Sequence, residues 1–139
     1  MKYGSIIIEK KEYVYLKRII NISGYAKDFD TKQSLQKFSE ELQNAQIVDE
    51  EDMPKEIIRF NSKVTVASEK GWERTLQVVT PAERDMAQNK ISFLTPMGSA
   101  LFGYSEGDTV TWDFPTGQQL LKIVAVSQET NSANKNISI

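Results

Sequence analysis

The stretch that decides the fold is residues 91–126, which read ISFLTPMGSALFGYSEGDTVTWDFPTGQQLLKIVAV. The pair Thr95-Pro96 is typical of a helix N-terminus, because the hydroxyl caps free backbone N–H groups and proline fits the first helical position. Apolar residues recur with helical spacing up to Gly103, and glycine readily takes the left-handed conformation that ends a helix. The pattern predicts a strand followed by a short helix.

The second half of the stretch predicts two strands joined by a tight turn. Residues 109–114 alternate between polar and apolar side chains, which is the period of a half-buried strand. Residues 115–117, Pro-Thr-Gly, are typical of a turn. Residues 120–126 are apolar on both faces, so we expect them to form a central strand of the sheet.

These motifs carry a resemblance to a known family. The string from Thr95 to Asp108, TPMGSALFGYSEGD, is followed by WDFPTG and a hydrophobic strand. This order and spacing resembles the C-terminal domain of the Gre transcript-cleavage factors, and the rest of the chain is most similar to the short Rnk-like members of the GreA/GreB family. The resemblance implies an FKBP-like fold, in which one short helix packs across an antiparallel sheet of about five strands.

Length and composition limit the alternatives. A chain of 139 residues is expected to form one compact domain with a small appendage. It contains no Cys and no His, so disulfides, thiolate chemistry and the commonest general base are excluded. The net charge is −2 without a basic cluster, which argues against a stand-alone nucleic-acid-binding protein.

No part of the sequence predicts contact with a membrane. None of its apolar runs approaches the roughly 20 residues needed to span a bilayer. The first eight residues, MKYGSIII, hold too short an apolar stretch for the core of a signal peptide. We therefore expect a cytoplasmic protein.

The N-terminal part predicts an antiparallel helical hairpin. Apolar residues recur at helical spacing in Glu9–Ile22 and again from Asp30 to Ala45, with a polar loop between them. Each arm would be only about 20 Å long. An acidic run ends before Met53-Pro54, where we place the domain boundary. The expected domains are residues 1–52, the hairpin or short coiled coil, and residues 53–139, the Gre-type domain.

The remaining pattern completes an α+β fold. Alternation predicts strands at residues 58–66 and 72–80, followed by a polar connector at residues 81–89. The Asn- and Ser-rich tail at residues 127–139 is expected to fray. The expected architecture is a short N-terminal helical hairpin followed by an FKBP-like antiparallel sheet with one short helix.

Nothing in the sequence marks a catalytic residue, a cofactor site or a metal site, and we expect a protein that is not an enzyme. The resemblance to Gre factors implies that two acidic residues at the hairpin tip help hold a catalytic Mg²⁺ and the attacking water. Asp28 and Asp30 lie in the corresponding loop. The loop does not reproduce the Gre tip pattern and the arm is much shorter than a Gre coiled coil, so we interpret both residues as solvated.

The resemblance also implies a partner, bacterial RNA polymerase. In the family the C-terminal domain docks on a coiled coil of the β′ subunit at the rim of the secondary channel. The matching residues are Thr95, Pro96 and Met97, although Met97 could equally belong to the core. We expect a monomer that competes with Gre factors, without cleavage activity, and that meets DNA only through the polymerase complex. Two alternatives stay open: an active cleavage factor, and a prolyl isomerase or chaperone module.

Overall fold

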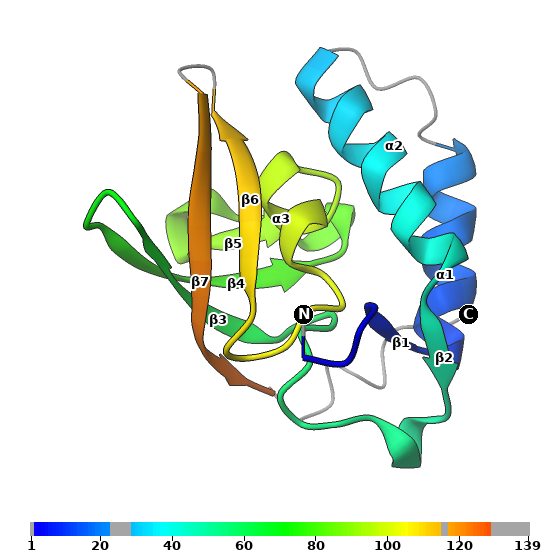
Figure 1. Cartoon of the computed structure of the whole chain (residues 1–139). Helices are drawn as coiled ribbons and strands as arrows, with labels where there is room; N and C mark the ends of the chain where they lie inside the picture. Colours follow the sequence, from blue (N-terminus) through cyan, green and yellow to red (C-terminus); the bar gives the residue numbers. More distant parts are fainter. Residues whose placement is uncertain (1, 23–28, 115–116, 129–139) are drawn as a thin grey trace.

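The computed structural model describes residues 2–22, 29–114 and 117–128, and the side chains of residues 2–21, 35–111 and 117–128. This part of the chain is a mixed α+β fold, in which helices lie on one side of a sheet (Figure 1). The helices are α1 (Lys10–Ile22), α2 (Phe29–Gln43) and α3 (Pro96–Leu101), with short 3₁₀ turns η1 (Glu50–Asp52), η2 (Pro81–Glu83) and η3 (Met86–Gln88). The strands are β1 (Ile7–Glu9), β2 (Gln46–Val48), β3 (Lys63–Ser68), β4 (Glu73–Val79), β5 (Lys90–Ser92), β6 (Thr109–Phe114) and β7 (Gly117–Ser127).

The main sheet has five strands in the order β5-β4-β3-β7-β6. Strand β3 is antiparallel to β4 and β7, and β6 is antiparallel to β7. Strand β5, however, runs parallel to β4, so the expectation of an entirely antiparallel sheet is wrong. The reason is the connector, because η2 and η3 carry the chain back along β4 where a tight turn would have reversed it.

Strand β3 begins later than predicted. Residues 58–62 form a turn: the N–H of Ser62 donates to the carbonyl of Arg59 at 3.1 Å, and Asn61 has a φ of 71°. A strand cannot pass through this left-handed backbone conformation. The alternation of apolar residues therefore continues through a turn, and β3 proper starts at Lys63.

Strand β7 lies inside the sheet by pairing, but only one of its faces is covered. Leu121 and Ile123 are fully buried, whereas Leu120 and Val124 are 47% and 43% exposed. The helices cover the first face, and none of the described helices covers the second (Figure 1). The apolar character of both faces therefore predicted the interior position of the strand, but overestimated how much of it is buried.

The core joins the N-terminal helices to the sheet. Helix α3 lies between the sheet and α2 (Figure 1). Phe38 of α2 contacts Phe93 and Phe102 with ring centroids 6.3 and 6.1 Å apart, and Phe60 and Phe102 pack edge to face at 4.9 Å. Leu16 and Leu42 belong to the same buried cluster. One continuous apolar core therefore includes residues from both sides of the expected domain boundary.

A small parallel strand pair, which the sequence did not predict, fixes the base of the helices. Strand β1 pairs with β2, with Ile7 opposite Gln46. The N–H of Ile7 also donates to the carbonyl of Gly103 at 3.1 Å. Gly103 has a φ of +85°, and a Cβ there would lie 2.8 Å from the Cβ of Ile6. Glycine is therefore required both to end α3 and to let β1 approach it.

None of the helices within the described residues is long and apolar enough to cross a membrane.

Candidate functional site

The first turn of α3 is the predicted docking segment, and its geometry follows the sequence. The hydroxyl of Thr95 accepts a hydrogen bond from the N–H of Gly98 at 3.0 Å and donates one to the carbonyl of Ser92 at 2.7 Å. Pro96 occupies the first helical position. Thr95 and Pro96 are both partly exposed. The turn is thus a rigid, capped surface feature at the start of a short helix.

Met97 faces the opposite way. Its side chain is 5% exposed and belongs to the apolar core. The helix backbone at the next residue, Gly98, packs closely against the end of β5. A Cβ at this position would lie 2.3 Å from the carbonyl oxygen of Ser92, so only glycine fits. The structure therefore brings Thr95 and Pro96 together at the surface, while Met97 supports them from beneath. Their role in docking stays a prediction.

The two predicted tip acids cannot be placed as side chains. Asp28 lies outside the described residues. Asp30 lies in the first turn of α2 by its backbone, and its side chain is outside the described part of the chain. Among the described residues, no group of three or more acidic side chains is arranged to hold a metal ion.

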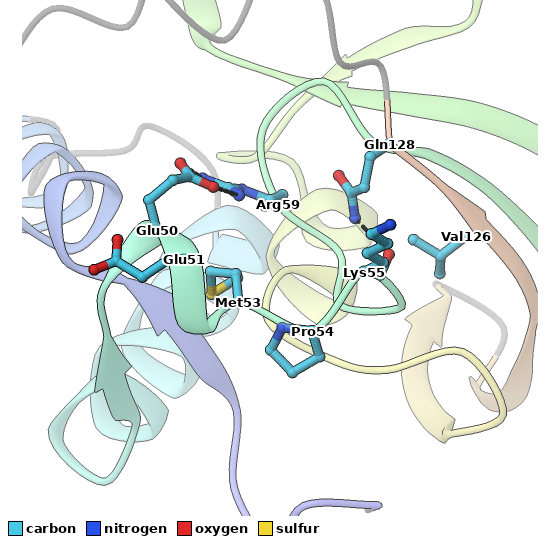
Figure 2. Close-up of a pocket in the computed structure, with 8 residues that line it drawn as sticks. All are labelled: Glu50, Glu51, Met53, Pro54, Lys55, Arg59, Val126 and Gln128. Atoms are coloured by element: carbon cyan, nitrogen blue, oxygen red, sulfur yellow. Dashed lines mark hydrogen bonds and ion pairs between the residues drawn. The ribbon is translucent and has the colours of Figure 1, made fainter.

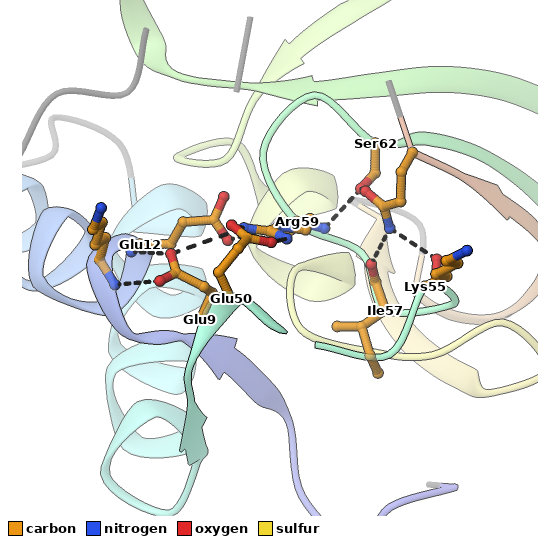
Figure 3. A network of polar contacts seen from close by, with 9 residues as sticks. Glu9, Glu12, Glu50, Lys55, Ile57, Arg59 and Ser62 are labelled. Carbon is orange, nitrogen blue, oxygen red and sulfur yellow. Dashed lines mark hydrogen bonds and ion pairs between the residues drawn. The ribbon is translucent and has the colours of Figure 1, made fainter. Parts of the chain in front are cut away.

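A buried ionic cluster, which sequence reasoning missed, joins the start of α1 to the turn before β3 (Figure 3). Glu50 binds the guanidinium of Arg59 through two hydrogen bonds of 2.6 and 2.8 Å. Glu12 accepts from Nε of Arg59 at 3.1 Å, and the nearest oxygen of Glu9 is 3.8 Å from Nη2. Three carboxylates thus surround one cation. The available signal was an arginine inside an otherwise apolar run, because buried arginine needs partners.

Glu9 has a second role as the cap of α1. Its carboxylate accepts hydrogen bonds from the N–H groups of Lys11 at 2.9 Å and Glu12 at 3.1 Å. A negative charge at this position interacts favourably with the helix dipole. The carboxylate of Glu9 therefore caps the N-terminus of α1 and also holds that end of the helix next to Arg59.

Burial and charge act on these acids in opposite directions. Burial raises the pKa of Glu12 to about 7, and the nearby charge of Arg59 only partly offsets this. Hydrogen bonds from Arg59 hold the pKa of Glu50 below its ordinary value. Glu50 is largely exposed and Glu12 is not. Of these two carboxyls, the buried Glu12 therefore ionises less readily than the exposed Glu50.

A groove of about 490 Å³ lies next to this cluster, between η1 and the end of β7 (Figure 2). Gln128 forms part of its wall and is fixed in place: its amide donates to the carbonyl of Ile57 at 2.6 Å, and its side-chain oxygen accepts from Ser62. The lining residues are Glu50, Glu51, Met53, Pro54, Lys55, Arg59, Val126 and Gln128. Arg59 and Gln128 therefore already have hydrogen-bond partners within the protein.

A second polar contact ties α2 to the body. The hydroxyl of Tyr104 donates to the carboxylate of Glu41. Burial raises the pKa of Glu41, and burial together with the hydrogen bond to Glu41 raises the pKa of Tyr104. Both long helices are therefore attached to the body by a carboxyl group as well as by apolar contacts.

The outer side of α1 carries only positive charge. Helical geometry of about 3.6 residues per turn places four cations on one side. They are Lys10, Lys11, Lys17 and Arg18, all exposed, and none of them belongs to an ion pair of the described residues. The acids Glu9 and Glu12 point inward to Arg59. The fold thus separates the charges of a segment whose sequence looked mixed.

Comparisons with known proteins agree with the resemblance carried by the α3 segment. Residues 53–128 match the family model described as transcription elongation factor, GreA/GreB, C-term. The chain is 36% identical over 86 residues to transcription elongation factor GreA of Clostridium acetobutylicum, an alignment that covers 61% of this chain and 54% of that protein. It is 33% identical over 78 residues to the regulator of nucleoside diphosphate kinase of Escherichia coli, covering 55% and 57% of the two proteins.

A solved structure, that of a prokaryotic transcription elongation factor GreA/GreB from Nitrosomonas europaea, superposes with a TM-score of 0.71. It shares 30% sequence identity, and the match covers 88% of this chain and 98% of the other. The chain spans only about half the length of the curated relatives it matches.

Proposed function

This chain belongs to the GreA/GreB family of transcription elongation factors through residues 53–128, and from that premise we propose that it binds bacterial RNA polymerase and regulates transcription. The proposed docking place is the rim of the secondary channel, on the β′ subunit. The observation that carries the proposal is the family match across the α3 segment, which folds as a capped turn at the surface. A protein with this role would act in the cytoplasm, as a monomer.

The proposed docking contacts come from Thr95 and Pro96, with Met97 supporting them from the core. A rigid turn is a good anchor, because little conformational entropy is lost when it binds. The cationic side of α1 would add long-range attraction, since the polymerase carries nucleic acid. Contact with DNA would arise only through that complex.

We propose further that the protein competes with Gre factors without stimulating transcript cleavage. Helices α1 and α2 have only 13 and 15 residues, each about 20 Å long. Helix α2 packs on α3 through Phe38. Residues 1–52 would therefore be a short helical hairpin on an FKBP-like body formed by residues 53–139, and the tip would stop short of the catalytic magnesium.

A competition assay on stalled elongation complexes tests the docking. We expect the protein to displace a Gre factor, and Pro96→Lys to weaken this competition at least tenfold, because it places a flexible charge in the contact. Glu73→Lys, which places a lysine at an exposed position of β4, serves as the control and should compete like the wild type. If the wild-type protein fails to displace a Gre factor even at saturating concentration, the docking proposal is wrong.

Active cleavage is the rival that the GreA relatives favour. Adding the protein with Mg²⁺ to backtracked complexes distinguishes the two proposals. We expect no shortening of the RNA. If the RNA is shortened, and Asp28→Ala or Asp30→Ala abolishes the shortening, the protein is a cleavage factor. A proline-peptide isomerisation assay tests the remaining alternative, and we expect no activity in it.

A further inference from the structure

The ionic cluster that joins α1 to the sheet, here called the joint, contains more acidic groups than its one arginine can neutralise. Its members come from four places: Glu9 from β1, Glu12 from α1, Glu50 from η1 and Arg59 from the turn before β3. If all were ionised, three negative charges would face one positive charge. Lys11 is the further cation near this group, and it acts on Glu50 at the solvent side.

Exposure decides where the excess charge lies. The side chain of Glu50 is 66% exposed and takes two hydrogen bonds from Arg59, so its charge is both solvated and paired. The side chains of Glu9 and Glu12 are only 5% and 4% exposed. Glu9 accepts hydrogen bonds from two backbone N–H groups at the start of α1, whereas within the described residues Glu12 accepts one hydrogen bond, from Nε of Arg59. A buried carboxylate without full compensation is strongly unfavourable, and such a group takes up a proton instead.

We propose that Glu9, Glu12, Glu50 and Arg59 form a proton-binding joint, in which a proton on Glu12 keeps the first turn of α1 seated on the body. When the proton leaves Glu12 for solvent, two buried carboxylates face each other beside one guanidinium that Glu50 already occupies. Local opening of α1 then becomes easier, because it returns the charge of Glu12 to water. The inference goes beyond polymerase binding and does not depend on it.

The sign of the pH dependence follows from the raised pKa. Burial raises the pKa of Glu12 from 4.5 to about 7 in the folded protein. The group therefore contributes stability that is fully present below about pH 4.5 and is lost as the pH rises through about 7. The joint is tight at mildly acidic pH and loosens at mildly alkaline pH.

Hydrogen exchange of the isolated protein tests the joint. We compare protection of the α1 amides at about pH 6 and about pH 8.5, corrected for intrinsic exchange, in the wild type and in Glu12→Gln, which mimics the protonated acid. Wild-type protection of α1 should fall on the order of tenfold or more across this range, relative to β3 and β7. In Glu12→Gln it should change little. Glu51→Gln, an exposed neighbour of Glu50, is the matched control and should behave like the wild type.

A second measurement reads the proton directly. The side-chain carboxyl ¹³C signal of Glu12, assigned by its absence in Glu12→Gln, should titrate near neutral pH. Titration near its ordinary value, or a pH-dependent loss of α1 protection that persists in Glu12→Gln, would overturn the proposal. These measurements use the isolated protein without polymerase, so a negative result would not contradict the proposed function. A negative result in the competition assay would likewise not contradict the proton-binding joint.

Discussion

At the scale of single residues, Gly98 shows how the absence of a side chain positions the proposed docking turn. The backbone of α3 lies close against the end of β5, with the carbonyl oxygen of Ser92 only 2.3 Å from where a Cβ of residue 98 would be. The same close approach lets the Thr95 hydroxyl reach that carbonyl. Glycine at this position therefore allows the short distance between α3 and the end of β5.

We predict that Gly98→Ala destabilises the protein by about 3 kcal/mol, because the methyl group would overlap a backbone oxygen that cannot move freely. The free energy of unfolding in urea measures this. Ala100→Ser, a small change on a more exposed position of the same helix, should alter it by less than about 0.5 kcal/mol. A Gly98→Ala variant as stable as the wild type would show that α3 does not lie as close to β5 as described.

Arg59 is the residue on which the ionic joint depends. We predict that Arg59→Met destabilises the protein by about 3–5 kcal/mol at alkaline pH, because Glu9 and Glu12 stay buried without a cation. The loss should be smaller at about pH 5, where Glu12 can take up a proton. Urea unfolding at both pH values checks this. A loss that is the same at both values would contradict the role of Arg59 as a charge partner.

At the scale of elements, α3 is a six-residue helix that depends on its ends. A helix this short is unstable by itself, so its cap and its packing must hold it. Thr95 supplies the cap, and Gly103 ends the segment in a left-handed conformation. The shape of the proposed docking turn therefore depends on two local residues and on the strand beneath it.

We predict that Thr95→Ala costs about 1 kcal/mol of stability, because the N–H of Gly98 loses its partner. Thr95→Ser keeps the hydroxyl and should retain most of that stability. Thermal unfolding of the two variants, followed by circular dichroism, gives the comparison. Equal melting temperatures for the two would mean that the cap contributes nothing.

At the scale of the whole molecule, residues 1–52 and 53–128 share one apolar core. Phe38 of α2 packs against Phe93 and Phe102 of the body, and Tyr104 binds Glu41 across the same boundary. The expected boundary at residue 52 coincides with the start of the family match at residue 53. As a division into two domains it stays a proposal, and the shared core provides a test of it.

We predict a single cooperative unfolding transition, in which Phe38→Ala costs about 3–5 kcal/mol and lowers the protection of α2 and β3 together. Gln36→Ala, an exposed change on the same helix, is the control. Calorimetry and hydrogen exchange measure these effects. Two separate transitions, with the body unaffected by Phe38→Ala, would show that residues 1–52 fold independently.

The sequence by itself determined the local features of this protein and, through them, its family. The Thr95-Pro96 cap, the Gly103 helix end and the alternation in residues 73–79 depend only on neighbouring residues, so the pattern could be read directly. The same motifs predicted the capped turn at the start of α3, which we propose as the docking site. Their spacing was enough to identify the GreA/GreB relationship.

Only the tertiary structure decided which distant residues meet. The parallel direction of β5, the β1–β2 pair and the burial of Met97 depend on contacts made across the fold. The ionic joint is the clearest case, because Glu12 and Arg59 are 47 residues apart in the sequence. The residues around each of them do not indicate that the two side chains pair. The sequence shows that residue 12 is a glutamate, but the pKa of its carboxyl group depends on the burial and the charged partners that the folded chain provides.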